Sequence, residues 1–133
     1  MSILALVRPP PKSIFDIHDP VRIKWLYQLR VGLSPLYEHK MKHNFSDTIS
    51  DKCDVCKHTE NLEHFFLHCT RYTEARRTLL NFVLTINDVN FEQLQSREQI
   101  KMLLYGDVTL CASINKLILQ ATLDFLRDSE RFM

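Results

Sequence analysis

The sequence contains little glycine or proline and no long hydrophobic run. Only two glycines and five prolines occur among 133 residues, so long flexible linkers are not expected. No apolar run approaches the roughly 20 residues that a membrane-spanning helix needs. Residues 1–7 are too short and too uncharged for a secretory signal. We therefore expect an intracellular protein of the nucleus or cytoplasm, neither secreted nor inserted in a membrane, with its thiols in a reducing compartment.

The chain also lacks strand patterns and a strong net charge. No alternating run is longer than a few residues, and there is no internal repeat or low-complexity segment, which favours a mostly α-helical protein. The net charge is +1, slightly more positive in the first 80 residues than in the remainder. Charge alone therefore indicates neither a phosphate-binding face nor its absence. A chain of this length can bury one modest core.

Helix start and stop signals are clear near the amino end. Asp19-Pro20 combines an N-cap carboxylate with proline at the first helical position, and Gly32 is a suitable stop. The intervening apolar residues recur at helical spacing and predict a buried stripe of Val21, Trp25, Leu26, Leu29 and Leu33. Ser34-Pro35 predicts a second short helix that ends near Lys42.

The remainder of the chain also has helical patterns. Helices are expected over residues 60–67, 71–84, 96–106 and 109–129, the third starting with a Ser96–Gln99 capping box. Cys111 is expected to be a small core residue. The last helix has an apolar stripe that should pack on the helix of residues 71–84, although a partner chain could cover it instead: Leu110, Ile114, Leu117, Ile118, Ala121, Phe125 and Leu126.

Three of the four cysteines and three of the six histidines fall within seventeen residues, with the spacing Cys53-x2-Cys56-x7-His64-x4-Cys69. Two cysteines separated by two residues can direct both sulfurs at one point, as in half of a tetrahedral zinc site. A Cys3His set closes the coordination shell and leaves no position for water. The spacing therefore predicts one structural, non-catalytic Zn2+. A reduced metal-free cluster and a disulfide are the less favoured alternatives.

The histidine ligand is not settled by geometry alone. His58 would give a cramped chelate, and His68 is adjacent to Cys69, so the two side chains would diverge on a helix. His64 is preferred over His68 for its spacing. However, side chains five positions apart on an α-helix are rotated by about 140°, so His64 and Cys69 can converge only if the helix ends or distorts between them.

Basic residues near this segment are the candidates for phosphate contacts. The expected helix of residues 71–84 places Arg71, Arg76 and Arg77 toward solvent. Lys40 and Lys42 make the end of the second helix basic, which also suits the negative pole of a helix. Phe65, Phe66 and Leu67 are expected to exclude water from the sulfurs, with base stacking as an alternative.

The chain resembles the C-terminal region of non-LTR (LINE-type) retrotransposon reverse transcriptases over nearly its whole length. The resemblance rests on Cys53-x2-Cys56, Glu60, residues 64–69 and Arg76, on residues 14–20, 29–36, 39–45 and 103–107, and on Phe125-x3-Ser129-x-Arg131-Phe132. In that family this segment is a CCHC-type zinc-binding module that follows the polymerase domain and is thought to help hold template RNA or target DNA. By position, the ligands would be Cys53, Cys56, His64 and Cys69.

The sequence therefore predicts a small helical domain built around one zinc knuckle, with a C-terminal helical extension. Residues 1–18 are expected to be an extended lead-in, residues 19–86 the zinc-binding module, and residues 87–133 the extension packed on it. The chain contains no paired-aspartate polymerase motif, so we expect a non-catalytic piece of such an element that binds RNA or DNA. The alternative is a structural or protein-interaction module whose partner could be the parent polymerase domain.

Overall fold

The computed structural model describes residues 19–43 and 50–133. The helices, in chain order, are α1 (Pro20–Val31), α2 (Tyr37–Lys42), a π-helix (His64–His68), a 3-10 turn (Thr70–Tyr72), α3 (Thr73–Val83), a 3-10 turn (Phe91–Gln93), α4 (Ser96–Tyr105) and α5 (Ala112–Ser129). Within the described residues the only β pairing is one isolated antiparallel bridge, between Lys52 and Thr59. The mostly helical fold predicted from the sequence is therefore confirmed. The extended lead-in predicted for residues 1–18 lies outside the described residues, and the boundary at residue 86 stays a prediction.

Helix α1 begins and ends at the predicted residues. The Asp19 carboxylate accepts a hydrogen bond from the Arg22 backbone N–H at 3.1 Å, and proline occupies the first turn. Gly32 adopts a left-handed conformation with φ of 76°, and its N–H reaches the carbonyls of Gln28 and Leu29. These caps depend on residues close in sequence, which is why the pattern predicts them.

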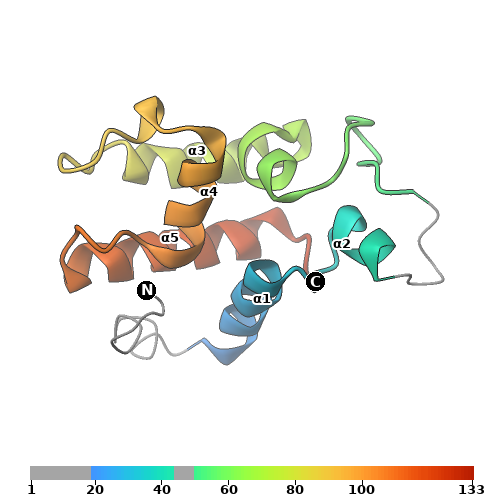
Figure 1. Cartoon of the computed structure of the whole chain (residues 1–133), viewed down its shortest axis with the longest axis horizontal. Helices are drawn as coiled ribbons and strands as arrows, with labels where there is room; N and C mark the ends of the chain where they lie inside the picture. Colours follow the sequence, from blue (N-terminus) through green and yellow to red (C-terminus); the bar gives the residue numbers. More distant parts are fainter. Residues whose placement is uncertain (1–18, 44–49) are drawn as a thin grey trace.

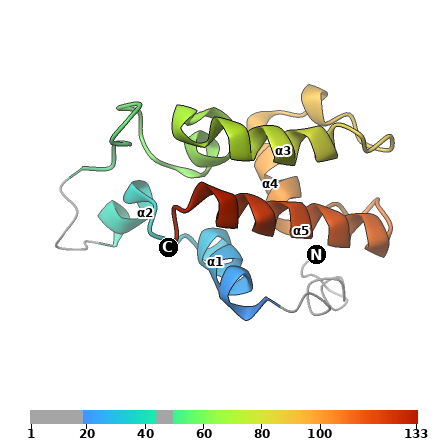
Figure 2. The ribbon, with the colours of Figure 1, turned by 180° about the vertical axis from the view of Figure 1, so that it is seen from behind.

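Helix α5 is the centre of the molecule. It lies between α3 and α1 in both ribbon views (Figures 1 and 2), and it contacts α3, α4 and α1. The prediction that the last helix packs on the helix of residues 71–84 is confirmed. The core includes side chains that are at most 1% exposed: Leu26, Leu29, Phe65, Phe66, Leu103, Ile118, Leu119, Leu123, Phe125 and Leu126. No described helix is both long and apolar enough to cross a bilayer.

Several sequence predictions about individual positions are wrong. Val21 and Leu33 are exposed rather than buried, because α1 turns only part of its apolar stripe toward α5, and Leu117 is half exposed. Cys111 is exposed at the N-cap of α5, because the helix begins at Ala112 and leaves the thiol outside the core. The capping box is absent: Ser96 lies inside α4, and the Gln99 amide instead donates to the Phe91 carbonyl.

Gly106, which ends α4, has no room for a side chain. Its φ of 77° and ψ of −165° suit only glycine, and an added Cβ would lie 2.6 Å from the Asn115 side-chain oxygen. That Asn115 oxygen accepts from the Asp107 N–H, while its amide donates to the Asp107 and Leu110 carbonyls. Asn115 thus fixes the loop that connects α4 to α5.

We therefore expect Gly106→Ala to lower the free energy of unfolding by about 3 kcal/mol, from backbone strain and the clash with Asn115. Gly32→Ala is the matched control, because Gly32 also has a positive φ but its Cβ would meet nothing closer than 4.0 Å. We expect the control to cost only about 1 kcal/mol. Urea denaturation of both variants measures the difference, and equal losses would contradict the proposed clash.

Candidate metal centre

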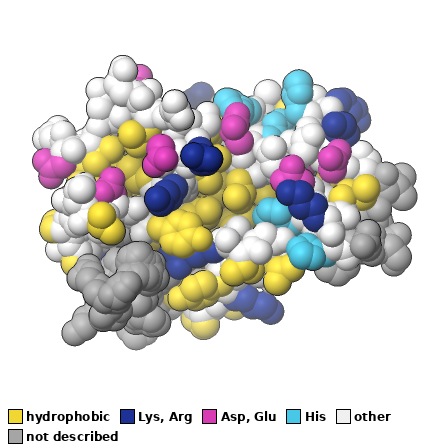
Figure 3. Space-filling model, viewed as in Figure 1, with side chains coloured by type: hydrophobic (Ala, Val, Ile, Leu, Met, Phe, Trp, Pro, Cys, Tyr) yellow, Lys and Arg dark blue, Asp and Glu magenta, His cyan; other side chains and the backbone are white. Residues whose placement is uncertain are grey.

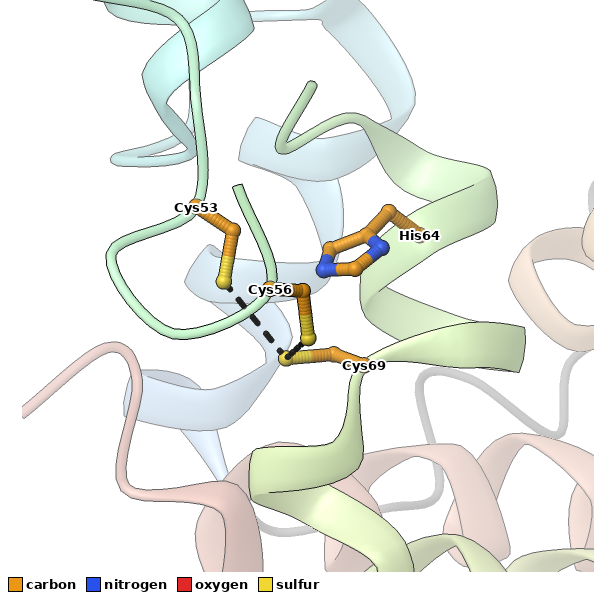
Figure 4. Close-up of side chains that lie close together, drawn as sticks. All are labelled: Cys53, Cys56, His64 and Cys69. Carbon is orange, nitrogen blue, oxygen red and sulfur yellow. Dashed lines mark hydrogen bonds between the residues drawn. The ribbon is translucent and has the colours of Figure 1, made fainter. Parts of the chain in front are cut away.

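The side chains of Cys53, Cys56, His64 and Cys69 converge on one point (Figure 4). Their ligand atoms all lie within 4.8 Å of one another. Cys53, His64 and Cys69 are buried, and Cys56 is partly exposed. This is the set that the spacing predicts, brought together from a turn, a distorted helix and the extended residue that follows it.

The two N-terminal cysteines sit on a tight turn. The Lys57 N–H donates to the Cys53 carbonyl at 3.0 Å, and the Cys53 N–H donates to the His58 carbonyl at 2.7 Å. Lys57 has a positive φ of 66°, which lets the chain reverse immediately after Cys56. The bridge between Lys52 and Thr59 closes the base of the turn. Both thiols are thereby held on the inside of the reversal.

His64 and Cys69 converge because the helix between them is a π-helix. The Cys69 N–H donates to the His64 carbonyl five residues earlier, at 2.7 Å, in place of the usual bond to the fourth residue. The Asn61 side chain accepts from the His64 N–H and so anchors the start of the segment. Cys69 is itself extended, with ψ of 124°. The distortion that the His64 assignment required is therefore present.

The spacing of the ligand atoms fits a tetrahedral zinc ion. The Cys69 sulfur lies 3.7 Å from the Cys53 sulfur and 3.9 Å from the Cys56 sulfur. Zinc–sulfur bonds of about 2.3 Å in a tetrahedron place two sulfurs about 3.8 Å apart. The cysteines are free, so the disulfide alternative is not supported. The Nε2 atom of His64 is buried without a hydrogen-bond partner among the described residues, and a metal ion would satisfy it.

The other two histidines of the segment do not join the cluster. His68 is exposed, and its Nε2 lies 3.2 Å from a Glu63 carboxylate oxygen. The exposed His58 ring is 6.1 Å from the ring of His64. Neither completes the group that could hold a metal ion. The structure thus favours His64 over His68, as the spacing did.

Burial sets the protonation of the metal-free ligands. It raises the pKa of Cys69 to about 12, so that this thiol is protonated at neutral pH when no cation is near. Burial also lowers the pKa of His64, which favours the neutral imidazole that metals bind. A hydrogen bond with Thr70 lowers the pKa of the Cys56 thiol. A divalent cation would therefore have to displace protons from the sulfurs in order to bind.

Arg71 lies beside the sulfurs. Its Nη2 is 3.8 Å from the Cys53 sulfur, and its guanidinium carbon lies 5.4 Å from the centre of the Tyr72 ring. Three thiolates around one divalent cation carry a net negative charge, which a neighbouring guanidinium stabilises. The structure thus places this sequence-predicted phosphate ligand next to the metal centre.

The remaining basic candidates have different surroundings. Arg77 is exposed and pairs with Glu74 at 2.7 Å, and the exposed Lys42 lies 3.7 Å from Glu38. Lys40, on the same helix, is half-buried. On the face shown in Figure 3, Lys and Arg side chains are interspersed with Asp and Glu, so that face has no continuous basic patch.

Arg76 does not point to solvent, and the prediction that it does is wrong. Its side chain is buried, where Nε donates to the Phe66 carbonyl at 2.8 Å and Nη2 donates to the Phe65 carbonyl at 3.1 Å. These carbonyls belong to the π-helix that carries His64. Arg76 therefore satisfies the backbone of the metal-binding segment and is not available to a phosphate.

We expect Arg76→Ala to lower the free energy of unfolding by about 2–4 kcal/mol, because two buried carbonyls lose a charged donor. Arg77→Ala is the matched control one residue along the same helix, and it should change stability by less than about 1 kcal/mol, since its ion pair is exposed. Chemical denaturation measures both. Comparable losses in the two variants would refute the structural role of Arg76.

A buried ion pair joins the metal-binding segment to the end of the chain, and it was not predicted. Glu60 is 1% exposed, and its two carboxylate oxygens accept from Arg131 Nη2 at 2.7 Å and Nε at 2.8 Å. The same carboxylate accepts from the Tyr37 N–H at 2.8 Å, at the start of α2. Arg131 also donates to the Pro35 carbonyl at 2.8 Å. Through this ion pair, the segment that precedes His64 is connected to the start of α2 and to the C-terminal residues.

The chain was also compared with known proteins. No family model, curated protein or solved structure matches it. The metal centre is therefore supported by the positions of the chain's own residues: a Cys3His group that could hold one metal ion, within a helical protein.

Proposed function

We propose that this protein is a non-catalytic, zinc-stabilised module that binds RNA or DNA. The observation that carries the proposal is the Cys3His cluster, whose sulfurs are 3.7 and 3.9 Å apart and whose histidine has an unpartnered buried nitrogen. Four protein ligands close a tetrahedral shell, so a bound Zn2+ would stabilise the fold and would not activate water. Cys53, Cys56, His64 and Cys69 would hold it.

The nucleic-acid part of the proposal rests on two supports. The first is the resemblance of the sequence to the C-terminal region of non-LTR retrotransposon reverse transcriptases, from which we infer that the chain derives from such an element. The second is the set of basic candidates that is left after Arg76 is assigned to the core: Arg71, which lies beside the sulfurs, and Arg77, Lys40 and Lys42. Phosphate contacts by such side chains release counterions and depend on salt.

The test is a titration of a labelled single-stranded oligonucleotide with the zinc-loaded protein, followed by fluorescence anisotropy. If about three phosphates are contacted, raising the salt from about 50 to 200 mM should weaken binding roughly 20-fold. Arg77→Gln should weaken binding and flatten this dependence. Binding that is insensitive to salt, or the absence of binding at low salt, would overturn the nucleic-acid assignment.

A second candidate is a protein-interaction module, in which zinc only holds the helices together. It is favoured by an apolar groove between α3 and α5, lined by Ala75, Phe82, Leu117 and Ala121 and edged by Asp124 and Asp128. The interspersed charges in Figure 3 also suit it better than a nucleic-acid interface. A mass above the monomer that rises with concentration, together with no oligonucleotide binding, would favour this candidate.

A further inference from the structure

A mixed polar and aromatic pocket lies where α1, α2 and the C-terminal residues meet. The end of the chain lies between α1 and α2 in both ribbon views (Figures 1 and 2). The pocket has a volume of about 360 Å³ and is lined by Lys24, Trp25 and Gln28 of α1, by residues 33–35, by Lys40 of α2 and by Phe132. We refer to it as the Trp25 pocket. It is separate from the cysteine cluster.

The pocket contains an aromatic surface held in a fixed orientation. The Trp25 ring stacks on the Phe132 ring with centroids 5.6 Å apart and an interplanar angle of 30°. Phe132 in turn packs against the buried Phe65 ring at 5.9 Å, and the preceding Arg131 is locked to Glu60. The indole is therefore held in place by its packing on Phe132, which itself packs on the core, and it remains partly exposed at the pocket. A preformed aromatic surface of this kind stacks a planar base without a large entropic cost.

The charge at the pocket suits a phosphate. Lys24 and Lys40 line the pocket from two different helices, and the described residues that line it include no Asp or Glu. The other described pockets differ in this respect. The groove between α3 and α5 contains Asp124 and Asp128, and the pocket at His58 and His68 contains Glu63. Lys24 is exposed and forms no ion pair with any residue that the structure describes.

We propose that the Trp25 pocket binds one nucleotide of a single-stranded nucleic acid, with the base stacked on Trp25 and the adjoining phosphate between Lys24 and Lys40. The Gln28 amide, which can both donate and accept, lines the same pocket and is placed to contact a base edge. A base inside a duplex is already stacked on its neighbours and cannot reach the indole, so the ligand is single-stranded. This inference rests on the proposed nucleic-acid-binding function and names the residues that perform it.

The chain has one tryptophan, so its fluorescence reports on this pocket alone. The experiment titrates the full zinc-loaded chain with an unlabelled oligouridine of about eight nucleotides, a length within the range of single-strand sites. Trp25 emission is followed in one series. Anisotropy of the same oligonucleotide carrying a terminal dye is followed in another. We expect saturable quenching of Trp25 with the same midpoint as the anisotropy change, and a much weaker response to a duplex of equal length.

Variants separate stacking from charge. Trp25→Leu should weaken binding about 5- to 150-fold, the range for loss of one stacked base, whereas Trp25→Phe, which keeps a ring, should retain most of the affinity. Lys24→Gln and Lys40→Gln should each lower the salt slope by about 0.7, the value for one phosphate on a single strand. Lys101→Gln, an exposed lysine of α4 that does not line the pocket, is the matched control and should bind as wild type. Circular dichroism confirms that each variant is folded.

The outcomes distinguish this pocket from the broader function. An anisotropy change with unaltered Trp25 emission, and with Lys24→Gln and Lys40→Gln binding as wild type, would overturn the pocket and leave nucleic-acid binding elsewhere on the protein. No anisotropy change at low salt would overturn both proposals. Equal quenching by single-stranded and duplex oligonucleotides would overturn the single-strand assignment.

Discussion

Cys69→Ser is expected to abolish high-affinity zinc binding and to unfold the segment from the Cys53 turn through the π-helix. The serine hydroxyl does not replace a thiolate as a zinc ligand. The Cys69 sulfur lies close to the sulfurs of both Cys53 and Cys56, so its loss removes a ligand that both neighbours face. Apparent zinc-binding energies in small zinc domains are about 10–16 kcal/mol, comparable to the whole stability of a typical domain. Zinc content and circular dichroism measure the two effects.

Cys111→Ser is the matched control for this substitution. Cys111 is exposed at the N-cap of α5, 42 positions from Cys69 and outside the cluster. Serine is a favourable N-cap residue, so we expect unchanged zinc content and unchanged or slightly higher stability.

A second pair of variants tests which histidine is the ligand: His64→Asn should lose zinc, and His68→Asn, at an exposed position, should keep it. Zinc loss in His68→Asn with retention in His64→Asn would show that the ligand is misassigned.

Glu60→Gln is expected to lower the free energy of unfolding by about 3–5 kcal/mol. The substitution leaves the Arg131 guanidinium without its charged partner in a largely buried site, and breaking a buried pair costs this much because the remaining charge is uncompensated. The loss should lower the midpoint of thermal unfolding by roughly 10 °C or more. Scanning calorimetry of the zinc-loaded protein measures it.

Glu74→Gln is the matched control, because Glu74 and Arg77 form an exposed pair that is worth less than about 1 kcal/mol. A double-mutant cycle of Glu60→Gln with Arg131→Gln separates the pair from other effects, and we expect the double variant to be more stable than the sum of the two single losses implies. An additive cycle would show that Glu60 and Arg131 act independently, contrary to the geometry of their two hydrogen bonds.

The sequence predicts best what depends on neighbouring residues. The Asp19 and Gly32 caps of α1 act over a few positions, and the cysteine turn needs only the spacing of Cys53 and Cys56. The π-helix is different. The requirement that the helix distort before Cys69 follows from the sequence, but the bond from Cys69 to His64 that meets it is visible only in the structure.

Arg76 shows how a pattern can be misread. It lies four residues after Tyr72 and three before Leu79, both buried, so helical periodicity places it on the core face of α3. The charge of Arg76 favours an exposed side chain, whereas its position in the helix indicates a buried one. The guanidinium is stable in the core because it donates to two carbonyls of the π-helix. That periodicity was the signal that could have found it.

The Glu60–Arg131 pair has no comparable signal in helical periodicity. The two residues are 71 positions apart, and neither is distinguished by composition or spacing as a buried charge. Such pairs depend on the tertiary arrangement that brings the end of α5 to the start of α2, which local patterns do not encode. The Trp25 pocket is similar, because Phe132 and Trp25 meet only when the chain end is in place.

The measurement that most directly tests the central claim is the zinc content of the protein purified without chelator, with circular dichroism recorded before and after EDTA. We predict one zinc per chain and a loss of helical signal when the metal is removed, because a bound ion would hold the Cys53 turn to the π-helix through the Cys3His ligands. A chain that contains no zinc and keeps its helices in EDTA would contradict the account, and would show that the converging cysteines and His64 do not stabilise the fold through a metal.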